Sequence, residues 1–108
     1  MPTAIIKSGI CGFTINATAE CEEADHVVLK IESDCPNYRK VAEVLHEVDA
    51  FHELFGERYE GEIWKVCARH SPHASCPVPT GLLKLVEVAA GLALPQTVSV
   101  EIRRSAAP

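Results

Sequence analysis

The sequence predicts an α+β domain in which a small, mostly antiparallel sheet of about four strands is covered on one face by about three helices. Apolar residues alternate with polar ones in the first third of the chain and near its C-terminal end, whereas in the middle they recur at helical spacing. The chain has 108 residues, of which 47% are hydrophobic and 23% charged. We therefore expect a single domain over residues 1–108 with one hydrophobic core.

Strands are predicted first. Residues 3–7 form a short strand that ends at Ser8-Gly9, and residues 11–21 form a longer, half-buried strand. After the acidic turn, residues 26–33 return beside it. The inward faces of the two longer strands carry Phe13, Ile15, Ala17, Ala19, Cys21, Val27, Leu29 and Ile31.

Helical spacing begins near Pro36 and predicts a helix over residues 36–48. The stretch 50–70 predicts one or two shorter helices, broken near Gly56 or Gly61. A further helix follows the loop 71–79 and ends at Gly91. Residues 96–104 alternate again and predict a C-terminal strand.

Charge and hydropathy exclude several functional classes. The net charge is −5, without a block of Lys and Arg, so a nucleic-acid surface is not expected. The apolar runs are too short to cross a bilayer, and the N-terminus lacks the pattern of a secretory signal. We expect a cytoplasmic protein, and an uncovered sheet face or edge is compatible with a homodimer. Five cysteines in a reducing compartment indicate metal binding or redox chemistry rather than disulfides.

The first hairpin suggests where two cysteines meet. If residues 11–21 and 25–35 pair around a turn near residue 23, Phe13 opposes Ser33 and Cys11 opposes Cys35. Opposed residues have Cβ atoms roughly 4.5–5.5 Å apart, which suits shared metal ligation. Cys21 would lie on the order of 30 Å away, at the turn.

Two Cys-Pro pairs, Cys35-Pro36 and Cys76-Pro77, each precede a predicted helix. Proline suits the first helical position, and the preceding residue then becomes the N-cap. The positive end of a helix favours a thiolate, the form that binds metal or attacks an electrophile. We therefore expect two cysteines at helix N-termini that point toward one cluster.

The predicted metal site combines four cysteines, with two histidines as less favoured ligands. Zinc accepts four thiolates or three thiolates and one imidazole, and iron–sulfur clusters usually take four cysteines. The expected ligands are Cys11, Cys35, Cys67 and Cys76, with His70 and His73 as the alternatives.

The order of the cysteines resembles the TSCPD domain family, found at the C-terminus of certain ribonucleotide reductases and as small free-standing four-cysteine proteins. The matching residues are Gly9-Ile10-Cys11, Asp34-Cys35-Pro36-Asn37, Cys67 and Ser75-Cys76-Pro77, within about residues 9–91. Ala74 and Val78 depart from the final motif, and Pro36 stands where the family usually has glycine. The resemblance implies a cysteine-rich, metal-associated module and supplies no activity.

Three functions follow from these residues. The first is a metal-binding module with thiolates around zinc, and the second is an iron–sulfur protein that uses the same ligands. The third is a thiol-dependent redox enzyme with Cys35 or Cys76 as nucleophile and His70 or His73 as base. The zinc module ranks first and the enzyme last.

Overall fold

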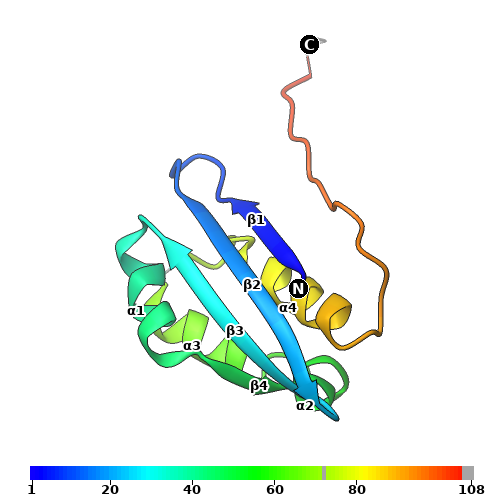
Figure 1. Ribbon diagram of the computed structural model, residues 1–108. Helices are drawn as coiled ribbons and strands as arrows, with labels where there is room; N and C mark the ends of the chain where they lie inside the picture. Colours follow the sequence, from blue (N-terminus) through cyan, green and yellow to red (C-terminus); the bar gives the residue numbers. More distant parts are fainter. Residues whose placement is uncertain (72, 106–108) are drawn as a thin grey trace.

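Four strands form one antiparallel sheet in which each strand lies beside its neighbours in sequence (Figure 1). The computed structural model describes residues 1–71 and 73–105. The strands are β1 (Thr3–Lys7), β2 (Thr14–Glu23), β3 (His26–Ser33) and β4 (Glu47–Asp49). This meander confirms the predicted α+β class and the antiparallel sheet.

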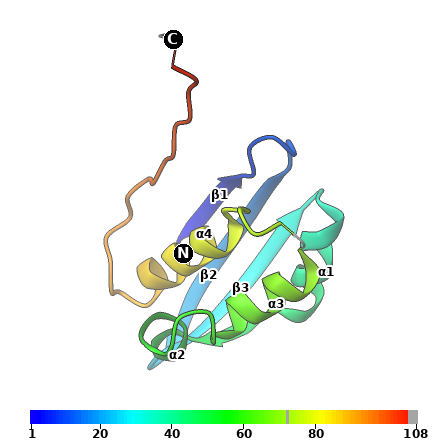
Figure 2. The same cartoon turned by 180° about the vertical axis from the view of Figure 1, so that it is seen from behind.

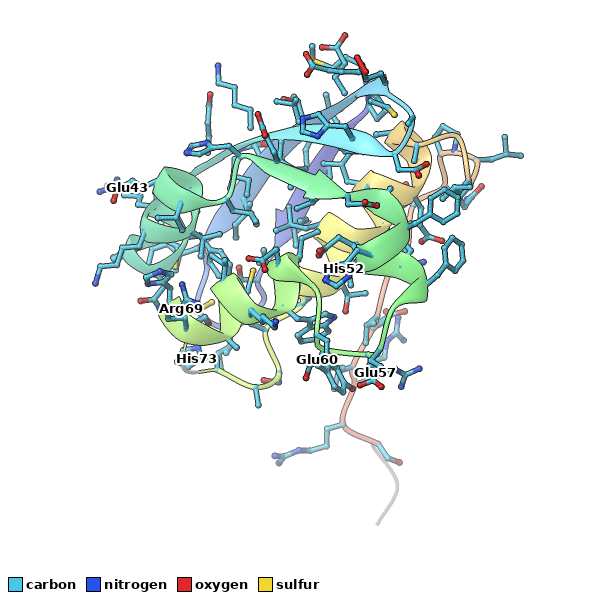
Figure 3. All side chains as sticks on the ribbon, turned by 90° about the horizontal axis from the view of Figure 1, so that it is seen from below. Glu43, His52, Glu57, Glu60, Arg69 and His73 are labelled. Atoms are coloured by element: carbon cyan, nitrogen blue, oxygen red, sulfur yellow. The ribbon has the colours of Figure 1, made fainter. Side chains whose placement is uncertain are left out.

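The helices lie together on one face of the sheet, as the view from behind shows (Figure 2). They are α1 (Pro36–Val44), α2 (Ala50–Phe55), α3 (Glu62–His70) and α4 (Val78–Ala89). The view from below shows the same two layers, strands on one side and helices on the other (Figure 3). The core lies between these layers, so one face of the sheet stays uncovered by the described elements.

Local sequence explains where the helices start and stop. Pro36 occupies the first turn of α1, and Asp49 caps α2 by accepting hydrogen bonds from the N–H groups of Phe51 and His52 at 3.0 and 3.2 Å. The predicted break is confirmed, because Gly56 ends α2 and Gly61 precedes α3. Gly91, with φ of 76°, follows the end of α4.

The register of the β2–β3 hairpin differs from the prediction by two residues. Ile15 pairs with Ser33 and Ala17 with Ile31, because the turn lies at residues 24–25 instead of near residue 23 and a bulge between Cys21 and Glu23 offsets the strands by one residue. A shift of two residues keeps every side chain on its predicted face, so the apolar set remains buried. In this register Cys11 cannot oppose Cys35. The prediction that the hairpin brings these two cysteines together was wrong.

The fourth strand is not the one predicted. Residues 47–49, expected at the end of the first helix, form β4, in which Val48 pairs with Val27. Val48 continues the helical spacing of Val41 and Leu45, so periodicity alone placed it in the helix. The predicted C-terminal strand 96–104 lies outside the sheet in the described chain, because a strand needs a hydrogen-bonding partner as well as a strand-like sequence.

The core joins the inner face of the sheet to α1, α3 and α4. The largest of its fully buried side chains are Ile15, Ile63, Leu82, Val27, Val41, Val78, Val86 and Cys67. None of the helices in the described residues is both long enough and apolar enough to span a membrane.

Candidate functional site

A cysteine and a tyrosine from different parts of the chain meet beside the core. Tyr38 lies on α1 and is only 2% exposed, and its hydroxyl is 3.1 Å from Sγ of Cys76 in the loop before α4. Cys76 itself is half-buried. Either group can donate in this contact when both are protonated, and the phenol is the donor once Cys76 is a thiolate.

Cys67 on α3 lies close enough to this pair to interact with it electrostatically. It is 1% exposed, and burial, followed by the charges of Cys76 and Glu53, raises the pKa of its thiol to about 12. Burial also raises the pKa of Tyr38 well above its usual range, and the hydrogen bond to Cys76 and the charge of Cys67 add to this shift. Tyr38, Cys67 and Cys76 are called the thiol cluster below. At neutral pH its Cys67 is an uncharged thiol and its Tyr38 an uncharged phenol.

The first Cys-Pro pair is placed as predicted. Cys35 is the N-cap of α1 and is buried, and its N–H donates to Oγ of Ser33 at 3.0 Å. Tyr38 lies three residues further along the same helix, and residues at this spacing lie on one face. Cys35 therefore belongs to the end of α1 that carries the thiol cluster.

The second Cys-Pro pair is placed differently. Helix α4 begins at Val78 with Pro77 as its N-cap, so Cys76 lies in the loop, one residue before the cap. Its N–H donates to the carbonyl oxygen of His73 at 3.2 Å. The prediction that Cys76 caps the helix was wrong by one position, because the proline next to it takes the cap and a second proline, Pro79, lies in the first turn.

Two cysteines lie elsewhere. Cys11 is exposed in the turn between β1 and β2, where Gly9 and Gly12 have φ of 86° and 79° and let the chain reverse. Its Sγ lies 3.9 Å from the carbonyl oxygen of Ser8. Cys21 lies at the opposite end of β2, where its Sγ is 3.2 Å from the carbonyl oxygen of Ala24. The prediction that Cys21 lies at the hairpin turn is confirmed.

The histidines considered as ligands lie beside the cluster in sequence. His70 is the last residue of α3 and is half-buried, whereas His73 is exposed (Figure 3). Within the described residues, no three His, Cys, Asp or Glu side chains form a group that could hold a metal ion. The expected ligands are therefore not gathered into one group within the part of the chain that the structure describes.

Sequence reasoning missed two residues of this region. Tyr38 falls within the predicted helix 36–48, and its hydroxyl gives no signal in a linear pattern. Glu53, 8% exposed, accepts hydrogen bonds from the N–H groups of Glu62 and Ile63 at 2.7 and 2.8 Å. It thereby caps α3, the helix that carries Cys67, and its charge contributes to the raised pKa of that thiol.

Comparison with known proteins gives a family but no activity. The model of a family of unknown function, DUF6951, matches residues 2–102, so the chain belongs to this family. No curated protein and no solved structure matches. The match is not to the TSCPD family, so that resemblance stays a prediction.

Proposed function

We propose that this DUF6951 member is a small dithiol protein in which Cys76 and Cys67 interconvert between two thiols and one disulfide. The observation that carries the proposal is the contact between Tyr38 and Cys76, next to a second thiol whose pKa responds to the charge of Cys76. A disulfide needs two sulfur atoms, whereas a zinc site needs four ligands. The dithiol therefore requires fewer groups beyond those that interact in the folded chain.

The order of the two cysteines follows from their exposure. Cys76 is half-buried and reachable, whereas Cys67 is 1% exposed. Cys76, as a thiolate, attacks one sulfur of an external disulfide, and the other sulfur leaves as a thiol after taking up a proton. Cys67 then loses its proton and attacks Sγ of Cys76, which releases the second external thiol. The external disulfide is reduced to two thiols, and the protein gains one disulfide.

Each residue of the thiol cluster has a distinct task in this scheme. The hydroxyl of Tyr38 donates to Sγ of Cys76 and stabilises its thiolate during the first attack. The pKa of Cys67, about 12, makes the second attack the slow step at neutral pH. Formation of the mixed disulfide removes the negative charge of Cys76, which is one of the causes of that raised pKa.

The test is to equilibrate the reduced chain with mixtures of oxidised and reduced glutathione, block free thiols, and map disulfides after trypsin digestion. Cleavage after Lys65, Arg69 and Lys84 places Cys67 and Cys76 on different peptides, so only an intact disulfide joins residues 66–69 to 70–84. We expect this linked pair in the wild type and in a Cys11→Ser, Cys21→Ser control. Glutathione attached to Cys76 without closure, or linkage among other cysteines, would reject the dithiol.

A zinc module is the second candidate. The favouring observation is that the charge of Cys76 raises the pKa of Cys67, because a cation between the two sulfurs would relieve this repulsion. Cys35 would supply a third thiolate, and His70 or His73 an imidazole. An iron–sulfur cluster would need Cys11 as well, from the exposed turn between β1 and β2.

Elemental analysis separates these candidates. Protein purified without oxygen or added metal would contain about one zinc per chain if zinc is resident, and loss of that zinc in Cys67→Ser would assign it. A brown sample with acid-labile sulfide would favour the iron–sulfur cluster. Metal-free, colourless protein that forms the 67–76 disulfide supports the dithiol alone.

A further inference from the structure

The C-terminal segment has the alternating sequence of a β-strand but is not paired with any strand of the described sheet. In residues 97–103, Val98, Val100 and Ile102 are 57%, 84% and 89% exposed. Nε of Arg103 donates to Oε1 of Glu101 at 2.8 Å, a contact between residues two apart on the opposite face. The segment is therefore extended and two-faced, with its apolar face in solvent.

The sheet offers a free edge for such a strand. Among the described strands β1 pairs only with β2. The N–H of Ser8 donates to Phe13 and that of Ala19 to Pro2, so the even-numbered residues of β1 exchange hydrogen bonds with β2. The N–H and C=O groups of Thr3, Ile5 and Lys7 therefore point outward along this edge, where they are available to another strand.

An apolar groove follows this edge. Its volume is about 680 Å³, and it lies between β1, α4 and the beginning of the C-terminal segment. Its apolar wall is formed by Ile6, Leu85 and Val88, and it is lined on the other side by residues 95–98. A strand added to β1 would place alternate side chains over this groove, which suits the apolar face of residues 97–103.

We propose that residues 97–103 form a fifth strand on the β1 edge of a second copy of this chain, and that the two copies exchange these segments reciprocally. Beyond residue 98, the segment runs away from the groove (Figures 1 and 2), and Val100 and Ile102 are exposed within one chain. Within one chain only the first residues of the segment line the groove, so the apolar side chains of Val100 and Ile102 stay uncovered, and the β1 edge of a second copy would cover them. The exchange pairs the free edges of both copies and covers both apolar faces.

The test is the mass of the chain in solution, measured by sedimentation velocity over a range of concentrations. We expect a dimer for the full chain, and for a chain that ends at residue 94 a monomer that keeps the helical signal in circular dichroism. Val100→Asp, on the apolar face, should raise the dissociation constant at least about tenfold, since it removes a buried valine and introduces a charge. Ser99→Asp, on the other face of the strand, is the matched control.

The receiving edge is tested separately. Ile5→Pro removes one outward N–H and should weaken the dimer as Val100→Asp does, whereas Ile5→Thr keeps the N–H and should not. Amide exchange should protect residues 98–102 only in the dimer. A full-length monomer, or a dimer that survives truncation at residue 94, would overturn the proposal. A monomer with protected residues 98–102 would show that the segment docks on its own β1 instead.

Discussion

Tyr38 connects the hydrophobic core to Cys76, the cysteine proposed to react first. Its hydroxyl lies 3.1 Å from Sγ of Cys76, while the ring is buried in α1. A change to phenylalanine keeps the packing and removes only the hydrogen bond. The variant therefore isolates what the hydroxyl does for the thiolate.

Tyr38→Phe should slow the alkylation of Cys76 roughly tenfold near neutral pH, because a hydrogen bond to a charged group contributes on the order of 1.5 kcal/mol. Mass spectrometry of peptide 70–84 after timed iodoacetamide labelling measures this rate. Tyr59→Phe is the control, since Tyr59 is exposed and packs edge-on against Trp64. Equal labelling rates in Tyr38→Phe and the wild type would remove Tyr38 from the proposed chemistry.

The buried thiol of Cys67 predicts a loss of stability at alkaline pH. Its pKa is about 12 in the folded chain against 9.0 for an unperturbed thiol, so the unfolded state loses this proton first. The stabilisation is complete below pH 9 and disappears as the pH rises toward 12, by up to about 4 kcal/mol in the free energy of unfolding. The raised pKa of Tyr38 acts in the same direction.

Urea denaturation at several values between pH 8 and pH 11 measures this dependence. Cys67→Ala should be less stable than the wild type at pH 8, because it leaves a cavity, but should lose less stability as the pH rises. Cys21→Ala, at a half-buried site, should keep the slope of the wild type. A Cys67→Ala variant with an unchanged slope would contradict the assignment.

At the scale of elements, Glu53 joins α2 to α3. Its carboxylate accepts the N–H groups of Glu62 and Ile63, which have no partner within the helix. Glu53→Ala should lower the free energy of unfolding by about 2 kcal/mol, whereas Glu57→Ala, at an exposed position, should change it little. Chemical denaturation of both variants measures the difference.

Gly61 provides a second measure of the same contact. A Cβ atom at this position would lie 2.7 Å from Oε1 of Glu53, so Gly61→Ala should push the carboxylate from the helix end. The cost of Gly61→Ala should therefore shrink in a Glu53→Ala background, since the clash is gone. Additive costs would show that the carboxylate does not hold α3 in this way.

Sequence patterns predicted the elements that local physics decides. Strands β1 to β3, the cap at Cys35, and the breaks at Gly56 and Gly61 follow from alternation, proline and glycine. Val48 could not be assigned, because its spacing fits a helix and its strand depends on Val27, far away in sequence. The β2–β3 register also depends on a bulge between Cys21 and Glu23, and no residue type in this stretch predicts it.

The candidate site was predictable to a smaller extent. Cys67 and Cys76 were recognised as ligand-type residues, but their meeting point depends on how α1, α3 and the loop before α4 pack. Cys11 was placed near Cys35 through a register two residues out, and the structure puts it in an exposed turn. Tyr38 became visible only once the helices were assembled.

At the scale of the whole molecule, the thiol cluster and the free edge belong to different parts of the fold. Tyr38, Cys67 and Cys76 lie on α1, α3 and the loop that precedes α4. The exchanged segment follows α4 and is proposed to bind β1. Dimer variants such as Val100→Asp should therefore leave the 67–76 disulfide unchanged, and a Cys76→Ser chain should still form the dimer.

The groove beside β1 has a practical consequence for anyone who makes this protein. Met1 and Pro2 line it together with the first residues of the C-terminal segment. An N-terminal purification tag would therefore lie beside the proposed contact, and a C-terminal tag would extend the strand that is proposed to bind there. Measurements of mass in solution belong on tag-free material, and a tagged sample that runs as a monomer would say little about the native chain.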